Sequence, residues 1–139
     1  MRIGSEGEFL QIDLLEVSTV QRRRDMRVGV TIGSHGFRGH MEDVWIDDLA
    51  LTQFLGHFNA LIESLQGTAV LESMSPDEFH LEIAPLDSRG HFQIAASLNR
   101  RAIQGRANRN DKVSAMLEFD QAELGPILGA FKSLLSSSE

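Results

Sequence analysis

Four carboxylates flank the only tryptophan of the chain and form the first group of side chains that could do chemistry. Glu42, Asp43, Asp47 and Asp48 surround Trp45 where a predicted strand meets a predicted helix. Carboxylates there accept hydrogen bonds from free helix N–H groups and favour the positive dipole end, by about 0.3–1 kcal/mol each. The alternative is an acidic patch for a basic partner, with Trp45 either its buried anchor or a core residue. A hydrolytic acid–base pair is a third interpretation, but it needs a cleft that raises one pKa.

The histidines are scattered in a pattern that does not predict a metal site. They are His35, His40, His57, His80 and His91. They lack the i, i+4 spacing and the clustered carboxylates that hold zinc, although His80 and His91 could face each other on neighbouring strands. Ser34 and His35 are expected to form part of a glycine turn, because adjacent side chains there rarely meet as nucleophile and base. We therefore predict no catalytic residue and no metal, and hence no enzyme.

Arginines are concentrated in residues 99–111, between two predicted strands. They are Arg100, Arg101, Arg106 and Arg109. A basic patch of this kind can contact phosphate or an acidic partner. No aromatic residues are interleaved to stack on bases, so a long solvated hairpin is the preferred interpretation. The glycine-containing segments 4–7 and 33–36 do not end in Lys-Ser or Lys-Thr and are not phosphate loops.

Two segments carry apolar residues at helical spacing and must position these groups. The first stripe consists of Leu51, Phe54, Leu55, Phe58, Leu61, Ile62 and Leu65. Asp47 or Asp48 is expected to cap its start, and Gly67 to end it in the left-handed conformation. The second stripe consists of Leu124, Ile127, Leu128, Phe131, Leu134 and Leu135.

The start of the second helix contains two opposing signals. Asp120 and Glu123 are spaced as a capping box, which favours a helix that begins beside them. Pro126 would remove an internal hydrogen bond of such a helix. Two arrangements satisfy both signals: a separate turn over residues 120–124 with a regular helix from near Pro126, or a helix whose first turns are kinked. The separate turn is the preferred expectation.

The remaining apolar residues alternate with polar ones, which is typical of half-buried strands. Val28, Val30 and Ile32 form one such run, and the GSHG segment after it predicts a hairpin into Phe37–Ile46. Because the later runs alternate as cleanly, antiparallel pairing is indicated. We predict an α+β fold, an antiparallel sheet of about five to seven strands with two amphipathic helices packed on one face. The expected core includes Phe54, Phe58, Leu61, Phe92, Ile94, Leu117, Phe119 and Phe131.

Composition restricts the possible partners. The chain has 139 residues, the size of one domain, so residues 1–139 are expected to fold around a single core. A formal net charge of −7 repels nucleic-acid phosphates and anionic membranes and favours a basic partner. The absence of cysteine excludes disulfides, thiolate zinc ligands and a thiol nucleophile. Residues 1–8 lack the apolar run of a signal peptide, and the predicted location is the cytoplasm.

Several short segments along residues 28–135 carry a resemblance to a known family. They include VWIDDL, LQGTAVL, RGHFQIAASL and MLEFDQAEL. The matching positions are Asp48 and Leu49, then Leu65, Gly67 and Ala69, then Gly90, and finally Phe119, Asp120 and Gln121. With these features the sequence resembles the bacterial WapI immunity proteins. The positions are structural rather than catalytic.

The resemblance implies a cytoplasmic protein without a cofactor that binds and neutralises the C-terminal toxin domain of a contact-delivered toxin. In the type case that toxin is an RNA-cleaving nuclease, and the charge of −7 is compatible with a basic nuclease. If the role is immunity, the expected partner-binding residues are Glu42, Asp43, Trp45, Asp47 and Asp48. The alternative is a non-enzymatic binding or self-associating module, and an exposed second sheet face leaves a homodimer possible.

Overall fold

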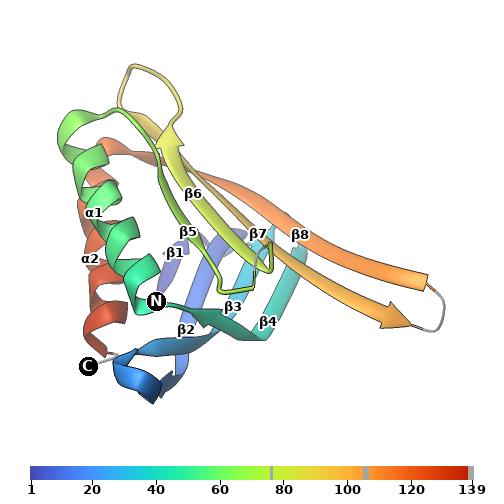
Figure 1. The fold of residues 1–139 in the computed structure, drawn as a ribbon. Coiled ribbons are helices and arrows are strands. Elements are labelled where there is room, and N and C mark those ends of the chain that lie inside the picture. The colour runs from blue at the N-terminus through green and yellow to red at the C-terminus, as the bar shows by residue number, and fades with distance from the viewer. Residues whose placement is uncertain (76, 105–106, 138–139) are drawn as a thin grey trace.

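A computed structural model describes residues 1–75, 77–104 and 107–137, with the side chains of Gln21 and of residues 101–110 outside the description. Over these residues the chain forms two four-stranded sheets, two α-helices and one short 3-10 helix (Figure 1). In chain order the elements are β1 (Arg2–Gly4), β2 (Glu8–Ser18), the 3-10 helix (Val20–Arg22), β3 (Asp25–Ser34), β4 (Phe37–Ile46), α1 (Asp48–Ser64), β5 (Ala69–Glu72), β6 (Phe79–Pro85), β7 (His91–Gln104), β8 (Ala107–Asp120) and α2 (Gln121–Ser137).

The strands are divided between two antiparallel sheets, ordered β1-β2-β3-β4 and β5-β6-β7-β8. The α+β class and the antiparallel pairing are confirmed, whereas the single sheet of five to seven strands is wrong. Within each sheet every strand pairs with its neighbour in the chain, and α1 separates the two runs. Alternation of apolar residues specifies which face of a strand is buried but not which strand lies beside it. The division could therefore not be predicted from the pattern alone.

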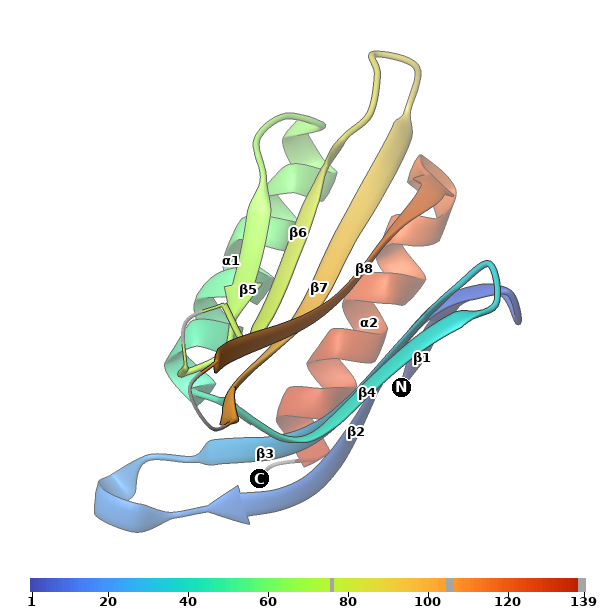
Figure 2. The ribbon, with the colours of Figure 1, turned by 90° about the vertical axis from the view of Figure 1, so that its right-hand side faces the viewer.

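Both helices lie side by side on the same side of the β5–β8 sheet (Figure 2). The three phenylalanines of their apolar stripes meet there, with ring centroids 5.8 Å apart for Phe54 and Phe58 and 5.0 Å apart for Phe54 and Phe131. The sheet contributes cross-strand neighbours such as Ile83 and Ile94, both fully buried. Burial of such apolar surface is the main stabilising contribution to the fold.

The β1–β4 sheet shares this core rather than forming one of its own. Ile12, Val30 and Val44 belong to the same buried cluster as Leu81 of the second sheet. Gly39 of β4 is pressed so closely against β8 that an added Cβ atom would overlap the Val113 side chain. All the expected core residues are buried except Phe119, which is only partly buried. No helix of the described residues is long and apolar enough to cross a membrane.

Helix α1 begins as predicted but ends earlier. The Asp47 carboxylate accepts a hydrogen bond from the Leu49 N–H at 2.7 Å, which is the expected cap. The residue that ends the helix is Leu65, with φ of 59°, and its N–H donates to the Leu61 carbonyl. Gly67, with φ of 91°, lies in the following turn. The prediction that Gly67 ends the helix is therefore wrong.

Helix α2 is continuous through its proline. It runs over Gln121–Ser137 with Pro126 inside, so the expected separate turn over residues 120–124 is wrong. The Asp120 N–H donates to the Glu123 carboxylate at 2.8 Å, which is one of the two bonds of a capping box. Leu124, Ile127 and Leu128 are buried on both sides of the proline. Their burial outweighs the single hydrogen bond that Pro126 removes.

Candidate functional site

The acidic junction, residues 42–48, connects the edge strand β4 to the start of α1. Val44 and Ile46 are fully buried, so Trp45 between them points to the opposite face of the sheet. Trp45 is partly exposed, lies opposite Arg27 of β3 and does not belong to the buried cluster. The interpretation of Trp45 as a core residue is therefore wrong. Its indole ring is on the outer face of the sheet.

A β-bulge places the first two carboxylates side by side. The register of β3 and β4 shifts between Val28 and Val30, so that Glu42 and Asp43 together oppose Gly29. Their side chains are 71% and 87% exposed. Bulges reorient side chains at sheet edges, and here the result is a pair of solvated carboxylates. A general acid needs shelter that raises its pKa, so this exposure does not favour the hydrolytic interpretation.

One arginine partly neutralises the junction. The Arg27 guanidinium contacts the Glu16 carboxylate at 3.0 Å and that of Asp43 at 3.8 Å, and donates to the Glu42 carbonyl. Glu42 also lies 3.3 Å from a ring nitrogen of His40. Asp47 is used in capping α1, and Asp48 lies in the first turn of that helix. The structure thus assigns Asp47 a structural role and leaves Glu42 and Asp43 as the most accessible carboxylates of the junction.

His35, His40, His80 and His91 lie beside carboxylates rather than beside each other. His80 is the cross-strand neighbour of Ser97, whereas His91 lies near the other end of β7 opposite Asp120. The expectation that His80 and His91 could face each other is therefore wrong, because the register of β6 and β7 separates them. His80 lies 2.9 Å from Glu72, and no group of three metal-ligating side chains occurs among the described residues.

His91 forms the only histidine pair for which a pKa change is resolved in the described part of the chain. Its Nδ1 lies 2.7 Å from the Asp87 carboxylate, and this hydrogen bond raises the pKa of His91 above 6.5. The same bond, with a second one from the Arg89 N–H, lowers the pKa of Asp87 below 3.8. Asp87 lies in the β6–β7 connection and His91 is the first residue of β7, where Asp120 lies 3.6 Å from the other ring nitrogen of His91.

The predicted glycine turn is confirmed. Ser34 pairs with Phe37, and the two residues between them have positive φ, 49° at His35 and 88° at Gly36. Such a two-residue turn suits the twist of a hairpin. The His35 ring contacts the Glu8 carboxylate, not Ser34, so these residues do not form a nucleophile–base pair.

The predicted hairpin around residues 99–111 is present, as β7 and β8 pair from His91 and Asp120 through to Gln104 and Ala107. Its two strands extend beyond the rest of the molecule (Figure 1). Arg100 is exposed. The side chains of Arg101, Arg106 and Arg109 lie outside the described residues, so the basic patch remains a prediction.

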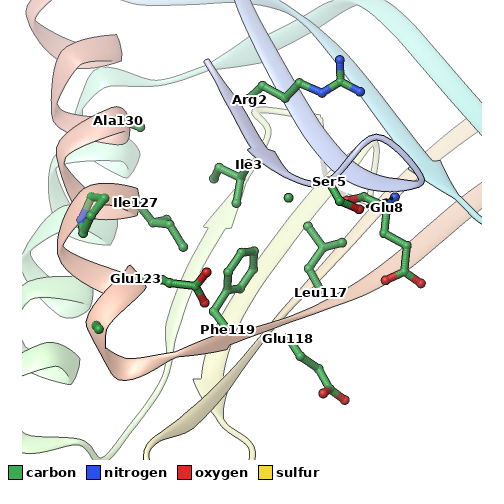
Figure 3. Close-up of a pocket in the computed structure, with 13 residues that line it drawn as sticks. Arg2, Ile3, Ser5, Glu8, Leu117, Glu118, Phe119, Glu123, Ile127 and Ala130 are labelled. Atoms are coloured by element: carbon green, nitrogen blue, oxygen red, sulfur yellow. Dashed lines mark hydrogen bonds between the residues drawn. The ribbon is translucent and has the colours of Figure 1, made fainter.

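A cleft of about 580 Å³ was not anticipated from the sequence. It lies between β1, the end of β8 and the first turns of α2 (Figure 3). Ile3, Leu117, Phe119 and Ile127 line its floor, and charged or polar residues surround it. Its walls come from opposite ends of the chain, so no local pattern could have predicted it. Partial exposure of Phe119, next to the buried Leu117 on the same face of β8, is the structural sign of the opening.

Comparison with known families gives one result. The model of a family described as the immunity protein WapI-like family matches residues 1–137. No match was found among curated proteins.

Proposed function

The chain belongs to the WapI-like immunity protein family, and from this membership we propose that it binds and neutralises the C-terminal toxin domain of a contact-delivered bacterial toxin in the cytoplasm. The observation that carries the proposal is the extent of the match, residues 1–137 of 139. Neutralisation by binding needs a complementary surface and no reacting group. The carboxylates of Glu42 and Asp43 support a binding role, because they stay largely solvated despite their contacts with His40 and Arg27 and can attract a basic partner.

The acidic junction is the surface that we expect the toxin domain to contact. Glu42 and Asp43 are largely solvated, and the overall charge of −7 adds a longer-range attraction for a basic domain. Charges at the rim of an interface mainly accelerate encounter, whereas a buried aromatic residue supplies binding energy. Trp45, partly exposed on the same strand, is suited to that second role.

The proposed function predicts a large toxin gene immediately upstream of this gene, and it is tested by expressing the C-terminal domain that such a gene encodes. We expect that domain to stop growth when it is expressed alone and to be harmless when this protein is co-expressed. The two purified proteins should form a stoichiometric complex that survives gel filtration. Arrested growth despite co-expression, together with no complex, would show that this protein is not the immunity partner of that toxin.

A double variant, Glu42→Gln with Asp43→Asn, tests the junction. At low salt we expect the association rate with the toxin domain to fall roughly 3- to 10-fold, because charges that steer encounter are lost. The difference should shrink in high salt, where screening removes the same attraction. Asp47 is left unchanged because it caps α1. Surface plasmon resonance at two ionic strengths measures both rates.

Two further variants complete that measurement. Trp45→Ala should accelerate dissociation and weaken the complex by about 2 kcal/mol or more if the indole is an anchor. Glu63→Gln removes a charge from the exposed end of α1 and serves as the matched control, with rates like those of the wild type. Unchanged kinetics in every junction variant would instead place the interface elsewhere, with the hairpin of residues 99–111 the next candidate.

A further inference from the structure

The cleft lies where the two sheets separate. β1 is the outer strand of the first sheet and β8 that of the second, and the cleft separates these two edges. The first turns of α2 form its third wall, through Ala122, Glu123, Pro126 and Ala130. A volume of about 580 Å³ is within the range of sites that hold small ligands or partner side chains.

The floor of the cleft is apolar. Figure 3 shows Ile3, Leu117, Phe119 and Ile127 converging on the hollow from three different elements. Three of these residues are buried by their own neighbours, whereas the Phe119 ring stays partly exposed. An apolar occupant lying on Phe119 would remove more of that ring from water, which favours binding.

The groups beside the floor are carboxylates. The Glu123 side chain lies next to Phe119, and Glu8 lies across the opening near Ser5 (Figure 3). The Glu8 carboxylate also contacts the His35 ring. One Glu123 oxygen accepts the Asp120 N–H, and no hydrogen bond to its other oxygen occurs among the described residues. Arg2 also lines the cleft but is directed away from it. Its guanidinium lies 3.8 Å from the centroid of the Phe9 ring.

We propose that this cleft receives a lysine or arginine side chain of the partner protein. The methylene groups of such a side chain would lie over Phe119 and Ile127, and its charged head would meet Glu8 and Glu123. A carboxylate or phosphate would be repelled by the same two groups. A purely apolar occupant would take water from the carboxylates without replacing their hydrogen bonds. The inference rests on the proposed function only in taking the partner to be the toxin domain.

The first experiment needs no toxin. The isotope-labelled protein is titrated with n-butylguanidinium, and the methyl signals of Ile3, Leu117 and Ile127 are followed by NMR. Butanol and butyrate are the neutral and anionic comparisons. We expect shifts at these methyl groups with the guanidinium, weaker shifts with butanol and none with butyrate. Equal binding of all three compounds, or no shift at the cleft, would overturn the inference.

Matched variants identify the site. Ala122→Phe fills the cleft from its helical wall, and Ala60→Phe makes the same change on the exposed surface of α1, outside the cleft. We expect the first to weaken guanidinium binding about tenfold and the second to leave it unchanged. Glu8→Gln removes a charge at the edge of the cleft without affecting the Asp120–Glu123 hydrogen bond. It should weaken the binding of n-butylguanidinium but not the binding of butanol. Loss of binding in Ala60→Phe as well would overturn the assignment to this cleft.

The second experiment uses the toxin domain and separates the two proposals. If wild type and Ala60→Phe bind the toxin and Ala122→Phe binds about tenfold more weakly, both proposals are supported. Equal binding by all three proteins would overturn the role of the cleft and leave the proposed function intact. If the wild type binds no toxin domain, the proposed function fails, and the NMR titration still decides whether the cleft binds a cationic side chain.

Discussion

At the scale of single residues, neighbouring side chains determine the pKa of His91 and the burial of Phe9, neither of which follows from the residue type alone. The His91 ring is held by Asp87 at 2.7 Å, with Asp120 at 3.6 Å from its other nitrogen. The hydrogen bond to Asp87 is the largest cause of the raised pKa of His91, and the attraction of the nearby carboxylates adds to it. Phe9, by contrast, is buried on the outer face of its sheet because Arg2 and Arg38 cover its ring.

The His91–Asp87 pair should make stability depend on pH at both ends of a window. Because the pKa of His91 is raised above 6.5, its contribution is complete below pH 6.5 and is lost as pH rises through the raised value. The pKa of Asp87 is lowered, so its contribution is complete above pH 3.8 and is lost as pH falls through the lowered value. Asp87→Asn should therefore lower the pKa of His91 toward 6.5.

NMR titration of the His91 ring in the wild type and in Asp87→Asn measures this effect. Asp13→Asn, a change of the same kind on β2, is the control that should leave the His91 titration unchanged. If the pKa of His91 were the same in Asp87→Asn as in the wild type, the hydrogen bond to Asp87 would not be the cause of the raised value.

Gly33 should not tolerate a larger residue. It lies opposite Phe9, and an added Cβ atom would overlap the Phe9 ring. We expect Gly33→Ala to lower the free energy of unfolding by about 1–3 kcal/mol through overpacking. Gly56→Ala in α1 is the matched control, because its Cβ would meet nothing within 4 Å, and it should stabilise the helix by about 0.5–1 kcal/mol. Urea unfolding of both variants measures the difference, and equal effects of the two substitutions would contradict this explanation.

At the scale of the elements, some helix and turn boundaries form where the local residue types predict them, and others are changed by packing against the core. The Asp47 cap and the His35–Gly36 turn form where the residue types predict them. Pro126 opposes the helix that contains it, yet α2 forms because its buried stripe continues across the proline. A capping, turn or proline residue therefore determines where an element begins or ends only when burial of the element's apolar face does not favour a different arrangement.

Replacement of that proline should stabilise the protein. Pro126 is exposed on α2 and cannot donate to the Ala122 carbonyl, so Pro126→Ala restores one helical hydrogen bond. The more flexible unfolded chain offsets part of this gain, and we expect a net increase of about 1–2 kcal/mol in the free energy of unfolding. Thermal and urea unfolding test it. Pro85→Ala at the end of β6 lies outside any helix and should give no such increase. Destabilisation by Pro126→Ala would show that the proline fits this helix better than alanine.

At the scale of the whole molecule, two sheets and two helices share one core. Residues from β2, β3, β4, β6, β7 and both helices belong to a single buried cluster. The close approach of Gly39 to Val113 joins the sheets directly. A chain of this length whose elements share one buried cluster is expected to lose its structure in a single cooperative step.

Two independent probes can test that cooperativity. Fluorescence of Trp45 reports on the first sheet, and far-UV circular dichroism reports mainly on α1 and α2. We expect the two unfolding curves in urea to coincide in midpoint and slope. Separate midpoints would show that the β1–β4 sheet unfolds independently of the helical layer.

The features that could be predicted from the amino-acid sequence are those that depend on residues close together in the chain. These are the two helical stripes, the alternating strands, an aspartate cap at residue 47 or 48, and the hairpin turn within residues 33–36. The antiparallel pairing and the family resemblance also follow from it, and the match over residues 1–137 confirms that resemblance. Each of these signals is repeated or local, so it survives without knowledge of the tertiary fold.

The tertiary structure alone decided which strands share a sheet, which face Trp45 occupies and where the cleft opens. The cleft joins Ile3 to Ile127, and the separation of His80 from His91 depends on the register between β6 and β7. Both features depend on how segments that are distant in the sequence pack their apolar faces around one common core. A pattern within a single segment states that a face must be buried, but only the packing of all segments together determines what buries it.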